Sequence, residues 1–172
     1  ALPAAQAQVP AYLHDAVELI GVAIAENTIT HDVAAFSKDG SVKSSVRGLM
    51  ADHLFDEGRH ARFWTQLVRL YWQSASSEDR DHIAQALPVF LTHYLTNDLQ
   101  KDFDLQLIEH LAISADTRRA LRDEIQALDF PITHQHPLLA NIMGLLHHSG
   151  VLQTPSVARA LRDYLPVSRR LA

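Results

Sequence analysis

The stretch MADHLFDEGRHARFW, residues 50–64, decides the fold class of this 172-residue chain. Apolar residues recur at helical spacing along it, yet His53, Glu57 and His60 interrupt the apolar stripe. Positions four and seven apart lie within about 40° of one another on an α-helix, so these three side chains share one face. The same face carries apolar residues before and after them, namely Val46, Met50, Trp64, Leu67 and Tyr71. We therefore predict a core-facing helix with a polar cluster at its centre.

The polar cluster is typical of a metal site. Burying a carboxylate and two imidazoles without hydrogen-bond partners costs on the order of several kcal/mol of folding free energy. Coordination to one metal ion would offset this cost for all three side chains. First-row metals of borderline softness accept nitrogen and oxygen ligands of this kind. The alternative is a helix turned toward solvent, because a lone Glu-x-x-His is common on exposed helices.

A second carboxylate, Glu26, belongs to the same prediction. It follows the apolar run LIGVAIA at residues 19–25, within a helix expected over residues 10–36. Two helices joined by a short turn pack antiparallel, so Glu26 is able to face the cluster from the neighbouring helix. The alternative is a Glu at a helix–helix contact paired with a Lys or Arg, since carboxylates are rarely buried without a partner. The predicted ligand set is Glu26, His53, Glu57 and His60.

The rest of the sequence is helical almost throughout. Apolar spacing, proline and glycine positions and polar turns predict helices over residues 10–36, 41–73, 77–97, 98–113, 115–128, 137–148 and 155–165. Pro88 is expected to kink the third, and the last is expected to dock on the bundle. No segment alternates as a strand does, and no repeat or low-complexity linker divides the chain. We predict one all-α domain over residues 1–172.

Composition limits the classes of function. The formal net charge is −5 and basic residues are scattered, which argues against nucleic acid as a partner. The absence of cysteine excludes disulfides and thiolate sites, and no apolar run approaches the ~20 residues of a membrane span. The first ten residues, ALPAAQAQVP, lack the pattern of a signal peptide. We expect a cytoplasmic protein with neither a membrane nor a nucleic-acid partner.

A Glu on one helix with Glu-x-x-His on its neighbour is half of a four-helix di-iron or di-manganese site. The segments AENTITHD (25–32) and ADHLFDEGRHARFW (51–64) are similar to the second half of the p-aminobenzoate N-oxygenase family, the AurF-type di-iron oxygenases. The resemblance covers residues 18–67 and includes the spacing from Glu26 to His53. It implies a ferritin-like, AurF-like helical bundle in which Glu57 bridges two irons, with manganese as the alternative metal, while Glu26, His53 and His60 bind one of them.

The activity that this resemblance implies is oxidation of an aryl amine nitrogen by O2, toward a hydroxylamine or nitro group, with an electron donor as partner. Two metals are needed because O2 accepts electrons from both. Two other classes stay open: a ferritin-like metal-binding bundle without oxygenation, and a metal-free helical interaction module in which Glu26 and Glu57 pair with arginines. An assay for O2-dependent oxidation of amines distinguishes an oxygenase from the metal-binding bundle. Elemental analysis for bound metal distinguishes both from the metal-free module.

The chain departs from the family pattern because it has no second Glu-x-x-His. Glu109 and His110 are adjacent and point about 100° apart, and the acidic residues of NDLQKDFD (97–104), Asp98, Asp102 and Asp104, are typical of a solvated helix face. We expect the remaining ligands from an N-terminal half of the same gene product, from another chain, or from a second copy in a homo-oligomer. The missing initiator Met favours the first. The chain alone should be inactive and should expose the apolar faces of its first two long helices.

The other clusters of charged residues are weaker candidates. His134 with His136 fits a loop, and His147 with His148 fits a helix C-terminus, where the helix dipole favours imidazolium. No carboxylate accompanies either pair at helical spacing. Beside the predicted ligands, Arg59 and Arg62 are expected to be surface groups or to support the ligands, and not to clamp a substrate.

Overall fold

The structure is a computed structural model, and it describes residues 1–96, 98–128, 132, 136 and 138–165, without the side chains of residues 31, 32, 98 and 99. Within these ranges every regular element is helical, so the all-α prediction is confirmed. The elements are α1 (Leu2–Gln6), the 3-10 turn η1 (Ala11–Leu13), α2 (His14–Lys38), α3 (Ser44–Ser74), α4 (Ser77–Leu95), α5 (Asp98–Glu109), α6 (Ala115–Ala127), α7 (Leu139–His148), α8 (Pro155–Ala160) and the 3-10 turn η2 (Arg162–Tyr164).

Every predicted helix has an observed counterpart, with three differences: α5 ends at Glu109 and not at residue 113, and the two others concern α1 and α8. Helix α1 was not predicted, because it is too short to show apolar periodicity; it has a proline in its first turn. The last predicted helix is shorter than expected, because α8 ends at Ala160 and the chain continues as η2. Pro88 lies inside α4, which continues to Leu95. As expected, α8 docks on the bundle, with Val157 and Leu161 buried.

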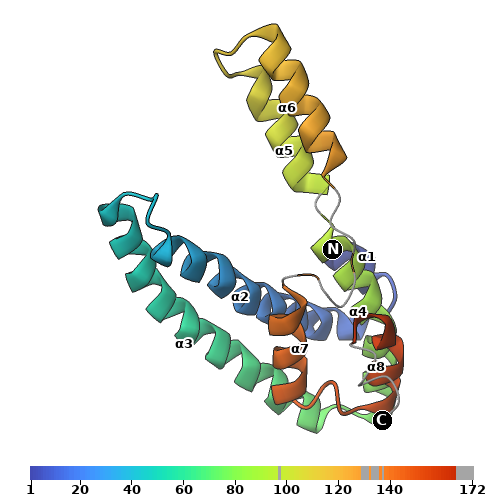
Figure 1. Cartoon of the computed structure of the whole chain (residues 1–172). Helices are drawn as coiled ribbons and strands as arrows, with labels where there is room; N and C mark the ends of the chain where they lie inside the picture. The colour runs from blue at the N-terminus through green and yellow to red at the C-terminus, as the bar shows by residue number, and fades with distance from the viewer. Residues whose placement is uncertain (97, 129–131, 133–135, 137, 166–172) are drawn as a thin grey trace.

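The hairpin of α2 and α3 is the largest unit of the fold (Figure 1). The two helices lie antiparallel and side by side, as predicted, and the turn between them is closed by local hydrogen bonds. Asp39 accepts from the Ser41 amide at 2.8 Å and from its hydroxyl at 2.7 Å, which lowers the pKa of the Asp39 carboxyl. The Arg47 guanidinium donates to the Val42 carbonyl at 2.6 Å. The turn therefore fixes how α2 and α3 face one another.

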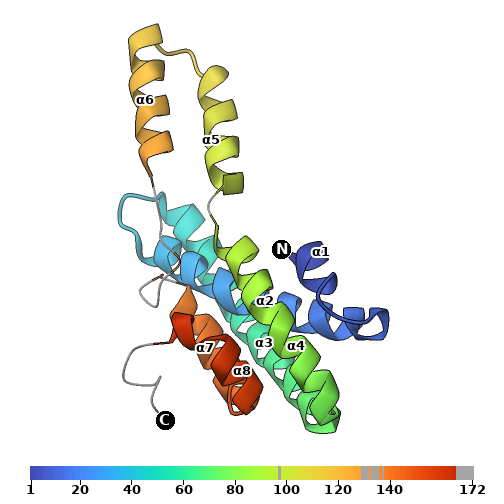
Figure 2. The ribbon, with the colours of Figure 1, turned by 90° about the vertical axis from the view of Figure 1, so that its right-hand side faces the viewer.

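The hydrophobic core lies at one end of this hairpin. There α1, α4 and α7 pack against α2, and α8 packs against α4 (Figures 1 and 2). Trp72 at the end of α3 is 3% exposed and donates from its indole nitrogen to Thr154 at 3.0 Å, while Arg80 donates to the Trp72 carbonyl at 2.7 Å. The largest fully buried apolar side chains of this core are Ile20, Ile24, Val68, Ile83, Leu91, Leu139, Ile142, Leu146, Val151, Val157 and Leu161.

Two helix hairpins project from the core. The turn end of α2 and α3 extends away from it, and α5 and α6 form a separate pair that stands clear in both views (Figures 1 and 2). Along α3 only Glu57, Val68 and Trp72 are buried. The prediction that α3 faces the core along its length is therefore wrong for its first half, where Val46 is exposed and no described helix other than α2 lies beside it.

In the described part of the chain, no helix combines the length and the apolar character needed to cross a membrane.

Candidate metal centre

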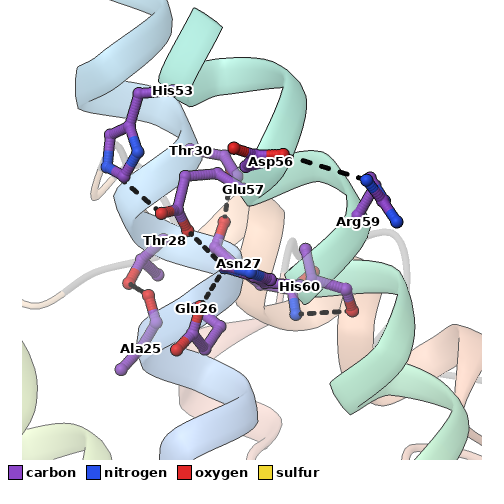
Figure 3. Close-up of polar contacts among 11 residues, drawn as sticks. Ala25, Glu26, Asn27, Thr28, Thr30, His53, Asp56, Glu57, Arg59 and His60 are labelled. Atoms are coloured by element: carbon purple, nitrogen blue, oxygen red, sulfur yellow. Dashed lines mark hydrogen bonds and ion pairs between the residues drawn. The ribbon is translucent and has the colours of Figure 1, made fainter. Parts of the chain in front are cut away.

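The predicted ligands meet halfway along the α2–α3 hairpin (Figure 3). Glu26 comes from α2, and Glu57 and His60, three residues apart, come from the facing side of α3. One ligand atom from each of these three residues lies within 4.8 Å of the other two. His60 Nδ1 is 3.8 Å from Glu26 Oε2 and 3.6 Å from Glu57 Oε2. Three of the four predicted ligands are thus brought together without any rearrangement of the backbone.

His53 approaches the same carboxylate from the other side. Its Nε2 lies 3.1 Å from Glu57 Oε1, one helical turn before the other ligands. His53 does not belong to the group of three; it contacts Oε1 of Glu57, whereas His60 faces Oε2. Each oxygen of the Glu57 carboxylate therefore has an imidazole beside it.

Burial separates the carboxylates from the imidazoles. The Glu57 side chain is 7% exposed and that of Glu26 is 30% exposed, whereas His53 and His60 are 45% and 55% exposed. The expectation of a buried cluster is correct for Glu57 and wrong for the histidines. The reason is that α2 covers only the Glu57 side of α3. On the other side an open pocket, lined by Asp56, Arg59, His60 and Phe63, borders the histidines.

One observation that does not depend on the sequence motif supports a metal ion at Glu26, Glu57 and His60. Glu57 Oε2 is buried and has no hydrogen-bond partner in the described part of the molecule. A buried carboxylate oxygen without a donor is costly, and a cation between two carboxylates and an imidazole removes that cost. Within the same residues no Lys or Arg forms an ion pair with Glu26 or Glu57; Arg59 lies 4.0 Å from Asp56 instead. Arginine pairing, which the metal-free alternative requires, is therefore absent from the described ion pairs.

The sequence model of the p-aminobenzoate N-oxygenase AurF family matches residues 2–147. The chain belongs to the AurF family. AurF proteins are oxygenases of the di-iron type, so the resemblance seen over residues 18–67 is confirmed and extended to most of the chain. No curated protein and no solved structure matches the chain significantly.

Neighbouring polar contacts hold the AurF-type cluster in place. These contacts were not predicted from the sequence. Asn27 donates to the Ala23 carbonyl at 2.8 Å and reaches the Ala61 carbonyl of α3 at 3.5 Å, beside His60. Asn141 of α7 donates to the Asn27 carbonyl at 3.4 Å. These contacts tie the two ligand-bearing helices to α7. An Asn within an apolar helix is the only sequence signal that points to them.

A further contact fixes the rotation of α2. The hydroxyl oxygens of Thr28 and Tyr94 are 2.5 Å apart, and Thr28 is buried. Because Tyr94 belongs to α4, this hydrogen bond anchors the face of α2 opposite the ligands to the core. Glu26 is thereby held toward α3.

The remaining candidates have structural roles. Glu109 pairs with Arg118 and Arg122 across α5 and α6. His147 and His148 end α7, as predicted, with their ring centroids 5.6 Å apart. Burial lowers the pKa of His136, whose Nδ1 accepts from the Leu138 amide at 3.3 Å.

Three of the earlier candidates have no described site role. His134 lies outside the described residues, and Arg62 is exposed on α3. The side chain of Asp98 is likewise outside the description.

Proposed function

We propose that this chain supplies half of the di-metal centre of an oxygenase that uses O2 to oxidise the amine nitrogen of an aryl substrate. Glu26, His53 and His60 bind one iron in this proposal, and Glu57 bridges to a second, with manganese as the alternative metal. The observation that carries the proposal is the Glu57 carboxylate. It is 7% exposed, has an imidazole beside each oxygen, and leaves Oε2 without a hydrogen bond.

The first oxidation step converts the amine to a hydroxylamine. An amine R–NH2, O2, two electrons and two protons give a hydroxylamine R–NHOH and water, so an N–O bond forms and the second oxygen atom leaves as water. When bound, the two metals accept and deliver the electrons that O2 requires. The electrons come from an external two-electron donor. Further oxidation of the hydroxylamine toward a nitro group repeats the same type of step.

The chain's own residues bind and orient. Asn27 and the Thr28–Tyr94 hydrogen bond fix α2, which holds Glu26 at His60. The open side of His53 and His60 gives O2, substrate and further protein ligands a way to the centre. Residues 1–172 form one all-α domain of the complete assembly in this proposal.

A complete di-metal centre needs more protein ligands than this domain contains. Two carboxylates and two imidazoles suffice for one metal and one edge of a second, so the complete centre needs another Glu and another Glu-x-x-His. In the described residues Glu26, Glu57 and His60 are the only group of three or more potential metal ligands of this kind. The complement therefore comes from protein other than the described part of one chain.

Metal binding is the first test. Anaerobic Fe(II) titration followed by elemental analysis should give bound iron in the natural assembly, and Glu57→Gln or His60→Ala should lower it strongly. Glu124→Gln is the matched control, because Glu124 is an exposed carboxylate on the distant α6. Because protons compete with a metal ion for the imidazole nitrogens, affinity should fall as the pH is lowered. Unchanged iron content in both site variants contradicts the assignment.

Turnover is the second test. The assembly loaded with iron should convert p-aminobenzoate, O2 and a reductant to the hydroxylamine, detected by mass spectrometry with 18O2 as the label. Iron binding without incorporation of 18O into any aryl amine supports the ferritin-like alternative. Absence of bound iron supports the interaction module.

A further inference from the structure

The end of the α2–α3 hairpin that lies away from its turn carries an open pocket of about 550 Å³. Here the last turns of α3 and α7 meet the start of α4 and the segment that leads into α8 (Figure 1). The volume falls within the range of small-molecule sites, roughly 300–1,000 Å³. Four basic side chains line the pocket: Arg69, Arg80, His147 and His148. The pocket is separate from the metal centre, because Arg69 follows Glu57 by 12 residues, about 18 Å along α3.

The lining of this pocket contains no acidic residue. None of its eleven residues is Asp or Glu, although the chain has 20 acidic residues against 15 Lys and Arg. Two other open pockets of the described structure each include a carboxylate, Asp56 beside His60 and Asp81 between α4 and α8. The pocket at the end of α3 therefore concentrates positive charge in a chain that is negative overall.

The basic side chains of the pocket are not neutralised by the protein. Among the residues that the structure describes, none of the four forms an ion pair with a carboxylate. The Arg80 guanidinium lies 5.8 Å from the centroid of the Trp72 ring and donates to the Trp72 carbonyl. Its buried Nε has no hydrogen-bond partner in the same part of the chain. Like charges that are close together repel one another, and an anion between them offsets that repulsion.

The loop after α7 gives the pocket further hydrogen-bond donors. Gly150 has a φ of 88°, the left-handed conformation that glycine adopts after a helix, and the chain turns back there toward Trp72. Trp72 Nε1 donates to Thr154 Oγ1 at 3.0 Å, so the Thr154 hydroxyl proton is not used in that bond. The His147 carbonyl at the end of α7 already accepts from the Gln153 amide and from the Gly150 amide. The pocket therefore presents donors from α3, α4, α7 and this loop.

We propose that this pocket binds the phosphate group of a small organic phosphate ester. The guanidinium groups of Arg69 and Arg80 have the planar fork of donors that fits phosphate oxygens, and an imidazole can donate an N–H in either protonation state. A phosphate dianion needs more than one cation, and this pocket offers two guanidinium groups with two imidazoles beside them. Because the phosphate group fills only part of the volume, the rest of the pocket receives the organic part of the ester.

Calorimetric titration of the iron-free 172-residue chain tests the site. The protein is kept free of iron because a bound metal ion would attract phosphate by itself. We expect phenyl phosphate to bind more tightly than inorganic phosphate, and benzoate to bind most weakly. Arg69→Gln should weaken phenyl phosphate binding about tenfold or more, the loss expected for a charge-assisted hydrogen bond. Arg69→Lys should weaken it less, because the charge is kept and only the fork of donors is lost.

The variants are chosen at exposed positions so that the fold is kept. Arg69 and His148 are exposed, whereas Arg80 also holds the end of α3 and is left unchanged. His148→Gln should likewise weaken binding, with unchanged helical circular dichroism. Arg119→Gln is the matched control, because Arg119 is an exposed arginine of α6 that does not line the pocket.

Three results would overturn the proposal. Absence of binding, or equal affinity in the parent, Arg69→Gln and His148→Gln proteins, removes the site. An equal loss in Arg119→Gln means that the ligand responds only to the overall charge of the protein. Benzoate binding as tightly as phenyl phosphate contradicts the assignment of phosphate, and equal affinity for inorganic phosphate and phenyl phosphate contradicts that of an ester.

Discussion

Replacing Glu57 by Met should stabilise the metal-free protein while removing its metal site. Glu57 Oε2 is buried without a hydrogen bond, which costs about 1–3 kcal/mol in the absence of metal. The substitution also loses the 3.1 Å contact with His53, but that imidazole is 45% exposed and such a contact contributes at most about 1 kcal/mol. Met and Glu have similar helix propensity, so α3 itself is unaffected. Subtracting the loss from the gain leaves a net stabilisation of about 0–3 kcal/mol, a rise in Tm of up to roughly 12 °C.

Urea unfolding with and without Fe(II) measures both effects. The parent protein should gain about 2.7 kcal/mol at a free metal concentration of 100 times Kd, and Glu57→Met should gain none. Glu124→Met, at an exposed position of α6, is the matched control and should change the unfolding free energy by no more than about 0.5 kcal/mol. The reasoning is refuted if metal-free Glu57→Met is less stable than the parent. That result would mean that the protein itself satisfies the carboxylate.

Three further predictions concern the core and the helix ends. Gly21→Ala should cost about 1–3 kcal/mol in urea unfolding, because the new Cβ would lie 2.9 Å from Phe90 Cε2 in the core. Gly48→Ala, with no heavy atom within 4 Å, should instead stabilise by about 1 kcal/mol, and equal effects at the two glycines would contradict the packing argument. Ser76→Ala should lose about 1 kcal/mol, since Ser76 forms a capping box with Asp79 at the start of α4; an unchanged urea midpoint would exclude that role. Hydrogen bonds from Ser76 and Tyr12 hold the pKa of Asp79 below its usual 3.8, so this carboxylate's contribution is complete above pH 3.8 and is lost as the pH falls through the lowered value. Tyr12→Phe should therefore reduce stability more at pH 7 than at pH 2, as followed by urea midpoints at the two pH values.

Local sequence patterns predicted most of the helices, because each depends on signals within a few residues. The polar segment before α4 is an example, since Ser76 and Asp79 cap the helix that follows them. Helix α1 and the end of α8 were not predicted, because five or six residues are too few to show periodicity. The candidate ligands were also predictable. Glu57 and His60 share a helix face by spacing alone, and the short turn after α2 sets Glu26 against them.

Which side of each helix is covered was not predictable from spacing. The stripe of α3 reads as core-facing from end to end, yet only its last turns meet α7, and its first half is open on the side of His53. Likewise, α5 and α6 read as ordinary bundle helices but stand apart as a pair (Figure 2).

The sequence by itself determined the helical class and most helix boundaries, and it predicted the four residues of the candidate site. Those features follow from backbone hydrogen bonding and side-chain spacing over one or two turns. The tertiary structure decided that Glu57 is buried with its Oε2 lacking a hydrogen-bond partner, and that His53 and His60 lie on the side of α3 that no described helix covers. Burial depends on which distant segments pack against a face, and an apolar stripe is the same in sequence whether its partner helix comes from the same chain or from another.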